Sequence, residues 1–216
     1  MFKRLAFISL VCMMFTSCGF LKSYTAKYDV SLATVESPAD ARAQFGETKV
    51  ASFTDGQINK YRYEDDYIDI VWYVSSTQFN FDLKNKSNHT IKINWDDISY
   101  VDCEGKTGRV MHSGVKYNER NNSQPASTIP KGASLSDILL PTDNVYFTSG
   151  KYGGWNERLL IPSIYQNQEA FAKEASSYVG KTMKILMPIM IENVQNDYTF
   201  EFTINSLLNP ELGVKK

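Results

Sequence analysis

The segment from Phe147 to Arg158 carries side chains that could recognise a ligand. Tyr152 and Trp155 provide two broad rings, the two glycines between them give a flexible backbone, and Arg158 adds a charged fork. Rings of this kind stack on sugar faces or anchor a protein partner, and loops of β folds commonly carry binding. We therefore take Tyr152, Trp155 and Arg158 as the candidate ligand-binding residues. The alternative is that Trp155 folds inward and plugs one end of the domain.

Residues that could catalyse a reaction are few. His112 and Ser113 place a base next to a hydroxyl, but neighbours on a strand point to opposite faces, and no G-x-S-x-G elbow occurs. The two Gly-Lys-Thr triplets, at 105–107 and 180–182, lack the glycine five places earlier that a phosphate loop requires. The sequence shows no catalytic signature and predicts a protein that is not an enzyme.

Metal ligands are also sparse. Acidic residues gather at 64–69 and 96–104, but no D-x-D-x-D-G calcium loop is present, which favours solvated turns. Met183 and Met187 share one face of an expected strand and Met190 lies on the other, which favours core packing over a copper site. His89 and His112 are the two histidines of the chain, which are too few for a histidine-rich zinc site. We expect no cofactor and no metal.

The N-terminus reads as a targeting signal. Two basic residues precede an apolar run from Leu5 to Phe15, and Thr16, Ser17 and Cys18 follow. The run is too short to cross a hydrocarbon core of ~30 Å, which needs about 20 helical residues. The pattern predicts a signal peptide over residues 1–17.

The end of this signal, Phe15-Thr16-Ser17-Cys18, resembles the lipobox of bacterial lipoproteins, with Phe15 in place of the usual Leu. The resemblance implies that Cys18 is the first mature residue and that its sulfur carries a diacylglycerol. It also implies a place in the bacterial cell envelope, and Gly19 after the cysteine favours the outer membrane. The alternative is an ordinary secretory signal whose cysteine is incidental.

Cysteine count and charge limit the partners. If Cys12 leaves with the signal and Cys18 is blocked by lipid, Cys103 is the only free thiol, so no disulfide can form within the chain. Asp102 and Glu104 beside Cys103 disfavour its thiolate. The near-zero formal net charge of −1 argues against a nucleic-acid partner. Loss of the two basic residues of the signal changes it to −3, which still indicates no particular charged partner.

Alternating apolar residues predict a mainly β protein. Residues 67–74 place Ile68, Ile70, Trp72 and Val74 on one face, and residues 78–83 continue the pattern and are expected to form a hairpin with 91–95. We expect further strands at 60–64, 98–102, 109–112, 133–140, 183–191 and 198–204. Pro188 cannot donate to a ladder, so that strand is expected to be an edge or to bulge there. One inter-sheet core should contain Trp72, Phe81, Ile93, Trp95, Phe200 and Phe202.

One α-helix is expected in the C-terminal half. Ser163 and Gln166 have capping-box spacing, an apolar stripe from Ile164 to Val179 follows, and Gly180 suits the position after the end. The expected domains are a lipidated tether at 18–48, a β domain at 49–209 and a tail at 210–216. A loose first strand within 18–48 is the alternative to the tether.

Residues 79–85, 91–95 and 198–204 resemble strands of immunoglobulin-like domains in secreted bacterial lipoproteins. The resemblance implies an antiparallel immunoglobulin-like β-sandwich and leaves function open. The predicted role is non-catalytic binding or assembly at the envelope, anchored through lipid, with an envelope protein or a glycan as partner. The alternatives are an envelope hydrolase acting on glycan and an adhesin or filament-associated subunit.

Overall fold

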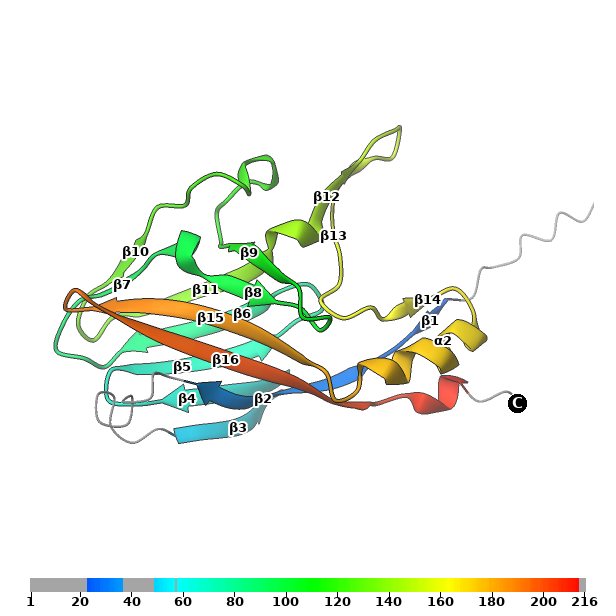
Figure 1. Cartoon of the computed structure of the whole chain (residues 1–216), viewed down its shortest axis with the longest axis horizontal. Coiled ribbons are helices and arrows are strands. Elements are labelled where there is room, and N and C mark those ends of the chain that lie inside the picture. Colours follow the sequence, from blue (N-terminus) through cyan, green and yellow to red (C-terminus); the bar gives the residue numbers. More distant parts are fainter. Residues whose placement is uncertain (1–22, 37–48, 57, 214–216) are drawn as a thin grey trace, which may run out of the picture.

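The computed structural model describes residues 23–36, 49–56 and 58–213. Cys18 and the predicted signal peptide lie outside these residues. The described chain is mainly β, every strand pair in it is antiparallel, and one short α-helix is present. Figure 1 shows a long, curled sheet with the helix at one end.

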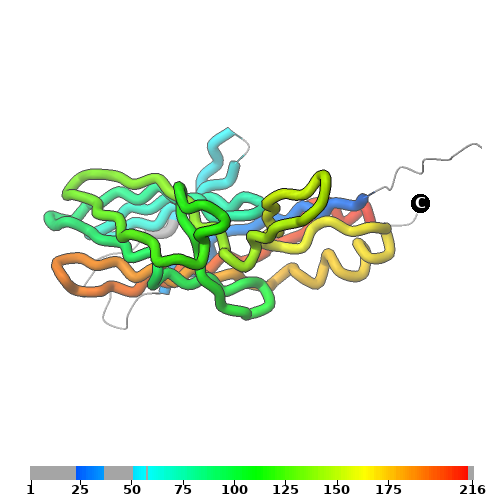
Figure 2. The backbone as a smooth tube through the Cα atoms, turned by 90° about the horizontal axis from the view of Figure 1, so that it is seen from above, coloured from blue at the N-terminus to red at the C-terminus, as the bar shows by residue number. Residues whose placement is uncertain are grey.

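One half of the curled sheet holds five strands in the order β3-β4-β5-β6-β11. Their bounds are β3 (Lys49–Asp55), β4 (Ile58–Glu64), β5 (Ile68–Val74), β6 (Phe79–Asn85) and β11 (Ser134–Pro141). β3 pairs only with β4 among the described strands, and Figure 2 shows the β3–β4 hairpin (cyan) standing away from the body. β3 is therefore a free edge.

The other half is built around two long strands that form a hairpin. Its members are β2 (Tyr28–Glu36), β7 (Ile91–Ile93), β8 (Ser99–Val101), β9 (Thr107–Met111), β10 (Ser127–Ile129), β15 (Thr182–Ile191) and β16 (Val194–Leu207). Leu140 pairs with Met111 where β11 meets β9, and this pairing joins the two halves. β2 pairs with β16 along most of its length, so the first strand left open as an alternative is present within the expected tether.

Aromatic side chains fill the space between the two halves. The Trp72 ring centroid lies 4.9 Å from Phe200 and 5.2 Å from Phe81. All six residues predicted for the core are buried in one cluster, together with Met183 and Met187. Period two therefore predicted the inward faces correctly for the five of the six predicted residues that lie in strands, whereas Trp95 is buried from the first position of a 3-10 helix.

The expected hairpin between residues 78–83 and 91–95 is wrong. β6 pairs with β5 and β11, whereas β7 pairs with β10 and β15 in the other half. Asn85 stabilises this crossover, because its buried Nδ2 donates to the carbonyl oxygens of His89 (2.7 Å) and Ile129 (2.9 Å). Local alternation cannot distinguish a turn from a crossing between halves.

Pro188 lies neither on an edge strand nor at a bulge, contrary to expectation. β15 has β16 on one side and both β8 and β7 on the other. The β8 pairing stops at Leu186 and the β7 pairing starts at Ile189. Pro188 therefore lies at a gap between these two pairings, where a residue without a backbone N–H is tolerated.

The helix is shorter than predicted and is capped differently. α2 (Gln168–Glu174) begins after Asn167, whose side chain accepts a hydrogen bond from the Ala170 N–H at 2.8 Å. Ser163 and Gln166 do not form the cap, because β14 (Ile164–Tyr165) pairs there with β1 (Tyr24–Thr25). The helix covers one end of the sheet (Figure 1).

Short 3-10 helices and one separate hairpin complete the described chain. The 3-10 helices are η1 (Trp95–Asp97), η2 (Tyr117–Glu119), η3 (Thr142–Asn144), η4 (Ala175–Tyr178) and η5 (Pro210–Gly213). β12 (Val145–Thr148) pairs only with β13 (Gly154–Glu157) among the described strands. Within the described ranges, no helix has the length and apolar character needed to cross a membrane.

Candidate functional site

The β12–β13 hairpin projects from the body of the protein, and we call residues 145–158 the arm (Figure 1). Its tip is a tight turn in which the Gly153 N–H donates to the Gly150 carbonyl oxygen at 3.0 Å. A Cβ at Gly153 would lie 2.1 Å from the Thr148 carbonyl oxygen, so only glycine fits there. Lys151 and Tyr152 form the corner of this turn, at the end of the arm.

Rings from two separate loops meet on one face of the arm. Phe147 pairs with Trp155 across the hairpin, with ring centroids 5.5 Å apart. Tyr117 in η2 contacts Trp155 edge-on at 5.9 Å, and the Arg120 guanidinium lies 5.2 Å from the Trp155 ring centroid. These contacts fix the orientation of Trp155 against the loop that carries η2.

A hydrogen bond at the base of the arm connects the same two loops. The Tyr117 hydroxyl donates to the Glu157 carboxylate, and this bond raises the pKa of Tyr117 above its usual value. The Arg120 Nη1 donates to the Tyr117 carbonyl oxygen at 2.8 Å. The arm is thus braced on one face.

The rings of the arm remain largely in contact with solvent. Tyr152 is 92% exposed, Phe147 60% and Trp155 40%. Trp155 therefore does not plug the end of the domain, and that alternative is wrong. Arg158 sits at the base of the arm, where its guanidinium lies 5.2 Å from the Tyr146 ring centroid.

The three predicted binding residues lie on one arm but do not converge on one pocket: Tyr152 is at the tip, Trp155 in the middle and Arg158 at the base. Sequence reasoning missed Tyr117 and Arg120, which belong to the loop that carries η2. Their contacts with Trp155 join segments that are far apart in the sequence. The one signal in the sequence was Tyr117, an aromatic residue in an otherwise polar segment.

A second feature, which the sequence did not indicate, lies between the free edges of the curled sheet. Two adjoining hollows of about 400 Å³ and 470 Å³ share Asp29, Asn59 and Tyr61 in their linings. They run along β2 on one side and β3, β4 and the end of β5 on the other, and we call them the edge groove. The Tyr61 hydroxyl donates to the Val30 carbonyl oxygen at 2.6 Å, which ties β4 to β2 beside it.

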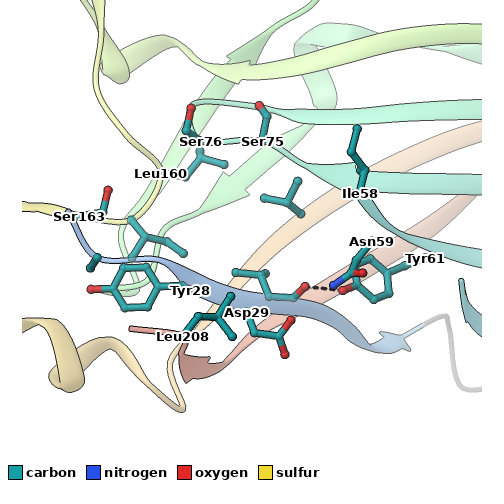
Figure 3. Close-up of a pocket in the computed structure, with 14 residues that line it drawn as sticks. Tyr28, Asp29, Ile58, Asn59, Tyr61, Ser75, Ser76, Leu160, Ser163 and Leu208 are labelled. Carbon is teal, nitrogen blue, oxygen red and sulfur yellow. Dashed lines mark hydrogen bonds between the residues drawn. The ribbon is translucent and has the colours of Figure 1, made fainter. Parts of the chain in front are cut away.

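Figure 3 shows the larger part of this lining, with Ser75, Ser76 and Leu160 opposite Tyr28 and Asp29. The rim carries exposed apolar side chains, Ile58 at 48% and Leu208 at 60%. Burial raises the pKa of Tyr61, so its hydroxyl stays a neutral donor at ordinary pH. The edge groove combines apolar walls, hydroxyl groups and one carboxylate.

His112 has an acidic partner, but Ser113 is not placed as a nucleophile. His112 Nδ1 lies 3.2 Å from Asp137 Oδ2, and its ring stacks on Trp95 with centroids 4.2 Å apart. The Ser113 backbone N–H donates to the other oxygen of Asp137 at 2.8 Å. Among the described residues, these contacts hold the His112 ring against Asp137 and Trp95 and fix the backbone at Ser113. We therefore assign His112 a structural role.

The acidic turns are not uniformly solvated. Asp65 is 1% exposed and accepts hydrogen bonds from the Tyr67 and Ile68 N–H groups (2.8 and 2.7 Å). Its other oxygen accepts from the Tyr198 hydroxyl at 2.9 Å and the Tyr63 hydroxyl at 3.2 Å. The prediction of a solvated turn is therefore wrong for Asp65. Within the described ranges, no three His, Cys, Asp or Glu side chains gather as a metal site would require.

Comparisons with known proteins add little. The chain matches no protein-family model and no curated protein. Among solved structures it is similar to one described as the X-ray structure of Northeast Structural Genomics Consortium target SoR45. That similarity covers 82% of this chain and 89% of the other, with 11% sequence identity and a TM-score of 0.27.

Proposed function

We propose that this protein is a lipid-anchored binding or assembly protein of the bacterial cell envelope, with the arm as its recognition surface. The observation that carries the proposal is the exposure of Phe147, Tyr152 and Trp155 on one projecting hairpin. Covering these exposed rings with a partner removes apolar surface from water, and this stabilises the complex. Tyr and Trp also lose little conformational entropy on binding, because each has only two side-chain torsions.

The chemistry of the arm suits either of the two expected partner classes. An exposed ring can stack on a sugar face, and it can equally anchor a pocket of an envelope protein. Arg120 and Arg158 lie over rings of the arm and keep cationic groups beside the apolar surface. Tyr152, Trp155 and Arg158 thus remain the proposed binding residues, supported by Phe147 and Tyr117.

The anchor and the finer fold assignment are part of the same proposal. The short apolar run before Cys18 supports lipidation at that residue and delivery to the envelope, and Gly19 supports the outer membrane. An immunoglobulin-like sandwich is supported by two antiparallel half-sheets that face each other across an aromatic core. Function does not follow from that fold, and it rests on the arm.

The test measures binding to isolated envelope material. Purified chain is sedimented with peptidoglycan sacculi and, in a second assay, cross-linked to a detergent extract of the outer membrane. Phe147→Ala and Tyr152→Ala should each reduce binding in one assay at least about tenfold, the equivalent of 1.4 kcal/mol.

Val194→Ala is the matched control, because Val194 is 50% exposed and lies at the start of β16, away from the arm. Equal binding by the wild type, the arm variants and this control would show that the arm is not the recognition surface.

A further inference from the structure

The edge groove exposes apolar side chains that no described residue covers. Ile58 and Leu208 stand at its rim, and Leu160 and Ile161 form the wall behind them. Phe53, 44% exposed, continues the apolar lining along β3. Exposed apolar side chains that line a hollow on a folded domain are typical of an interaction site.

The edge groove also carries an uncompensated negative charge. Asp29 lines both hollows, and neither lining contains a lysine, arginine or histidine. The Asp29 Oδ2 accepts a hydrogen bond from the Asn205 Nδ2 at 3.0 Å, and among the described residues Asp29 forms no salt bridge. A partner of this groove should therefore bring an apolar or aromatic group together with a cation.

The tip of the arm presents that combination. Tyr152 is almost fully exposed, and the Lys151 ammonium lies 5.4 Å from its ring centroid. Lys151 makes no salt bridge within the described part of the chain. The turn is narrow because Gly153 packs against the Thr148 carbonyl, so a ring and an ammonium group project at the end of a thin hairpin.

We infer that the tip of the arm of one molecule docks in the edge groove of a second copy of this chain. The Tyr152 ring enters between Ile58, Leu160 and Leu208, and the Lys151 ammonium faces Asp29. Ser76 lines the same hollow and offers its hydroxyl as a hydrogen-bond partner to the Tyr152 phenol (Figure 3), whereas the Ser75 hydroxyl already donates to the Gln78 carbonyl oxygen at 3.0 Å.

The arm cannot fill its own groove, because it points away from β2 and β3 (Figure 1). The contact is therefore made between molecules, either as a two-fold dimer that exchanges both arms or, where the exchange is not reciprocal, as a ring or open chain. This inference rests on the proposed function, since it takes the arm as a recognition surface and names the partner.

The experiment exchanges the two charges. The mature chain from residue 18 is prepared with Cys18→Ser, which removes lipid attachment, and its association is followed by sedimentation velocity over a range of concentrations. The Cys18→Ser chain, in which the arm and the edge groove are unchanged, should self-associate. Added salt should weaken this association, because an ion pair contributes to it. Lys151→Glu and Asp29→Lys should each weaken it at least about tenfold, because each places like charges together.

An equimolar mixture of Lys151→Glu and Asp29→Lys should recover association, because every arm in the mixture then finds a groove of opposite charge. Tyr152→Ala should weaken association without any rescue by mixing. Lys131→Glu is the control, since Lys131 is an exposed lysine in the turn before β11.

A chain that stays monomeric at all concentrations would overturn the inference, as would failure of the mixture to associate. If the chain is monomeric but Tyr152→Ala still loses binding to envelope material, the proposed function stands and only the second copy is wrong as the partner. If association behaves as expected and neither envelope assay responds to the arm variants, the arm serves self-assembly alone.

Discussion

Asp65 is a buried carboxylate that stabilises the turn between β4 and β5 from inside the protein. Each of its oxygens accepts two hydrogen bonds, two in total from backbone N–H groups and two from tyrosine hydroxyls. Burial raises the pKa of Asp65 above its ordinary value of 3.8, although these hydrogen bonds oppose the shift. The residue is therefore structural, and its charge costs free energy in the folded state.

Asp65→Ala should destabilise the protein by about 3 kcal/mol or more, because four donors, three of them buried, lose their acceptor. Asp65→Asn keeps the oxygen that accepts from the two N–H groups, so its cost should be within about 1 kcal/mol. Urea denaturation measures both free energies of unfolding. Similar losses for the two variants would show that the carboxylate does not organise this turn.

The pH dependence of stability, compared between the wild type and Asp65→Asn, gives a separate prediction. Because the folded-state pKa of Asp65 is raised, its contribution to stability is fully present below pH 3.8 and is lost as pH rises through the folded pKa. The stability of the wild type relative to Asp65→Asn should therefore fall as pH rises above 3.8 and then level off. A relative stability that instead rises with pH below 3.8 and levels off above it would mean that the pKa is lowered.

At the scale of single elements, β6 shows how alternation fixes the two faces of a strand. Phe79, Phe81 and Leu83 are buried between the halves of the sheet, and Asp82 points to solvent. Asn80 is an exception, because it is 6% exposed and its Oδ1 accepts from the Gln78 Nε2 at 2.8 Å. Asn80 is therefore a poor surface control, and Asp82 is the better one.

Phe81→Ala should cost about 3 to 5 kcal/mol, because it removes a buried ring that contacts Trp72 and leaves a cavity. Asp82→Ala should stay within about 0.5 kcal/mol. Denaturant midpoints of the two variants provide the comparison. A larger loss for Asp82→Ala than for Phe81→Ala would contradict the assigned faces.

The arm offers a matched pair of glycine substitutions. Gly153→Ala should distort the turn, because its Cβ would meet the Thr148 carbonyl oxygen at 2.1 Å, whereas a Cβ at Gly154 meets nothing within 4 Å. We expect Gly153→Ala to lower self-association and envelope binding at least about tenfold, and Gly154→Ala to lower them much less. Thermal unfolding of both should stay near that of the wild type, since the arm lies outside the main core. Equal binding by the two variants would show that the shape of this turn does not matter for recognition.

At the scale of the whole molecule, the described chain starts at the end where β1, β14 and α2 pack together, so an anchor before residue 23 would hold that end toward the membrane (Figure 1). The small cluster of Tyr165, Phe171 and Ala175 there stands apart from the main core. Cys103 is the free cysteine among the described residues, and its thiol is poorly suited to react as a thiolate. Burial is the main cause that raises the pKa of Cys103, and the charges of Glu104 and Asp102 add to it.

Cys18→Ser should release the protein from membranes, because the thiol is the proposed site of lipid attachment. Fractionation of cells that express the variant, with mass spectrometry of the wild-type N-terminus, provides the measurement. Unchanged membrane partition, or a mature N-terminus other than Cys18, would contradict the anchor.

The sequence by itself determined which side chains face inward, because the two-residue period of a strand is a local property. Trp72, Phe81 and Phe200 were assigned to the core on that ground alone. The same period determined that Met183 and Met187 pack inward and that the chain is mainly β.

Tertiary structure alone decided which strands pair and which surfaces remain free. The β6–β7 crossover depends on Asn85 reaching a carbonyl 44 residues away, and the burial of Asp65 depends on a hydroxyl 133 residues away. The edge groove arises from β2 and β3, which are far apart along the curled sheet and leave their outer edges unpaired among the described strands. No local pattern encodes such contacts, because they depend on how the sheet curls in three dimensions.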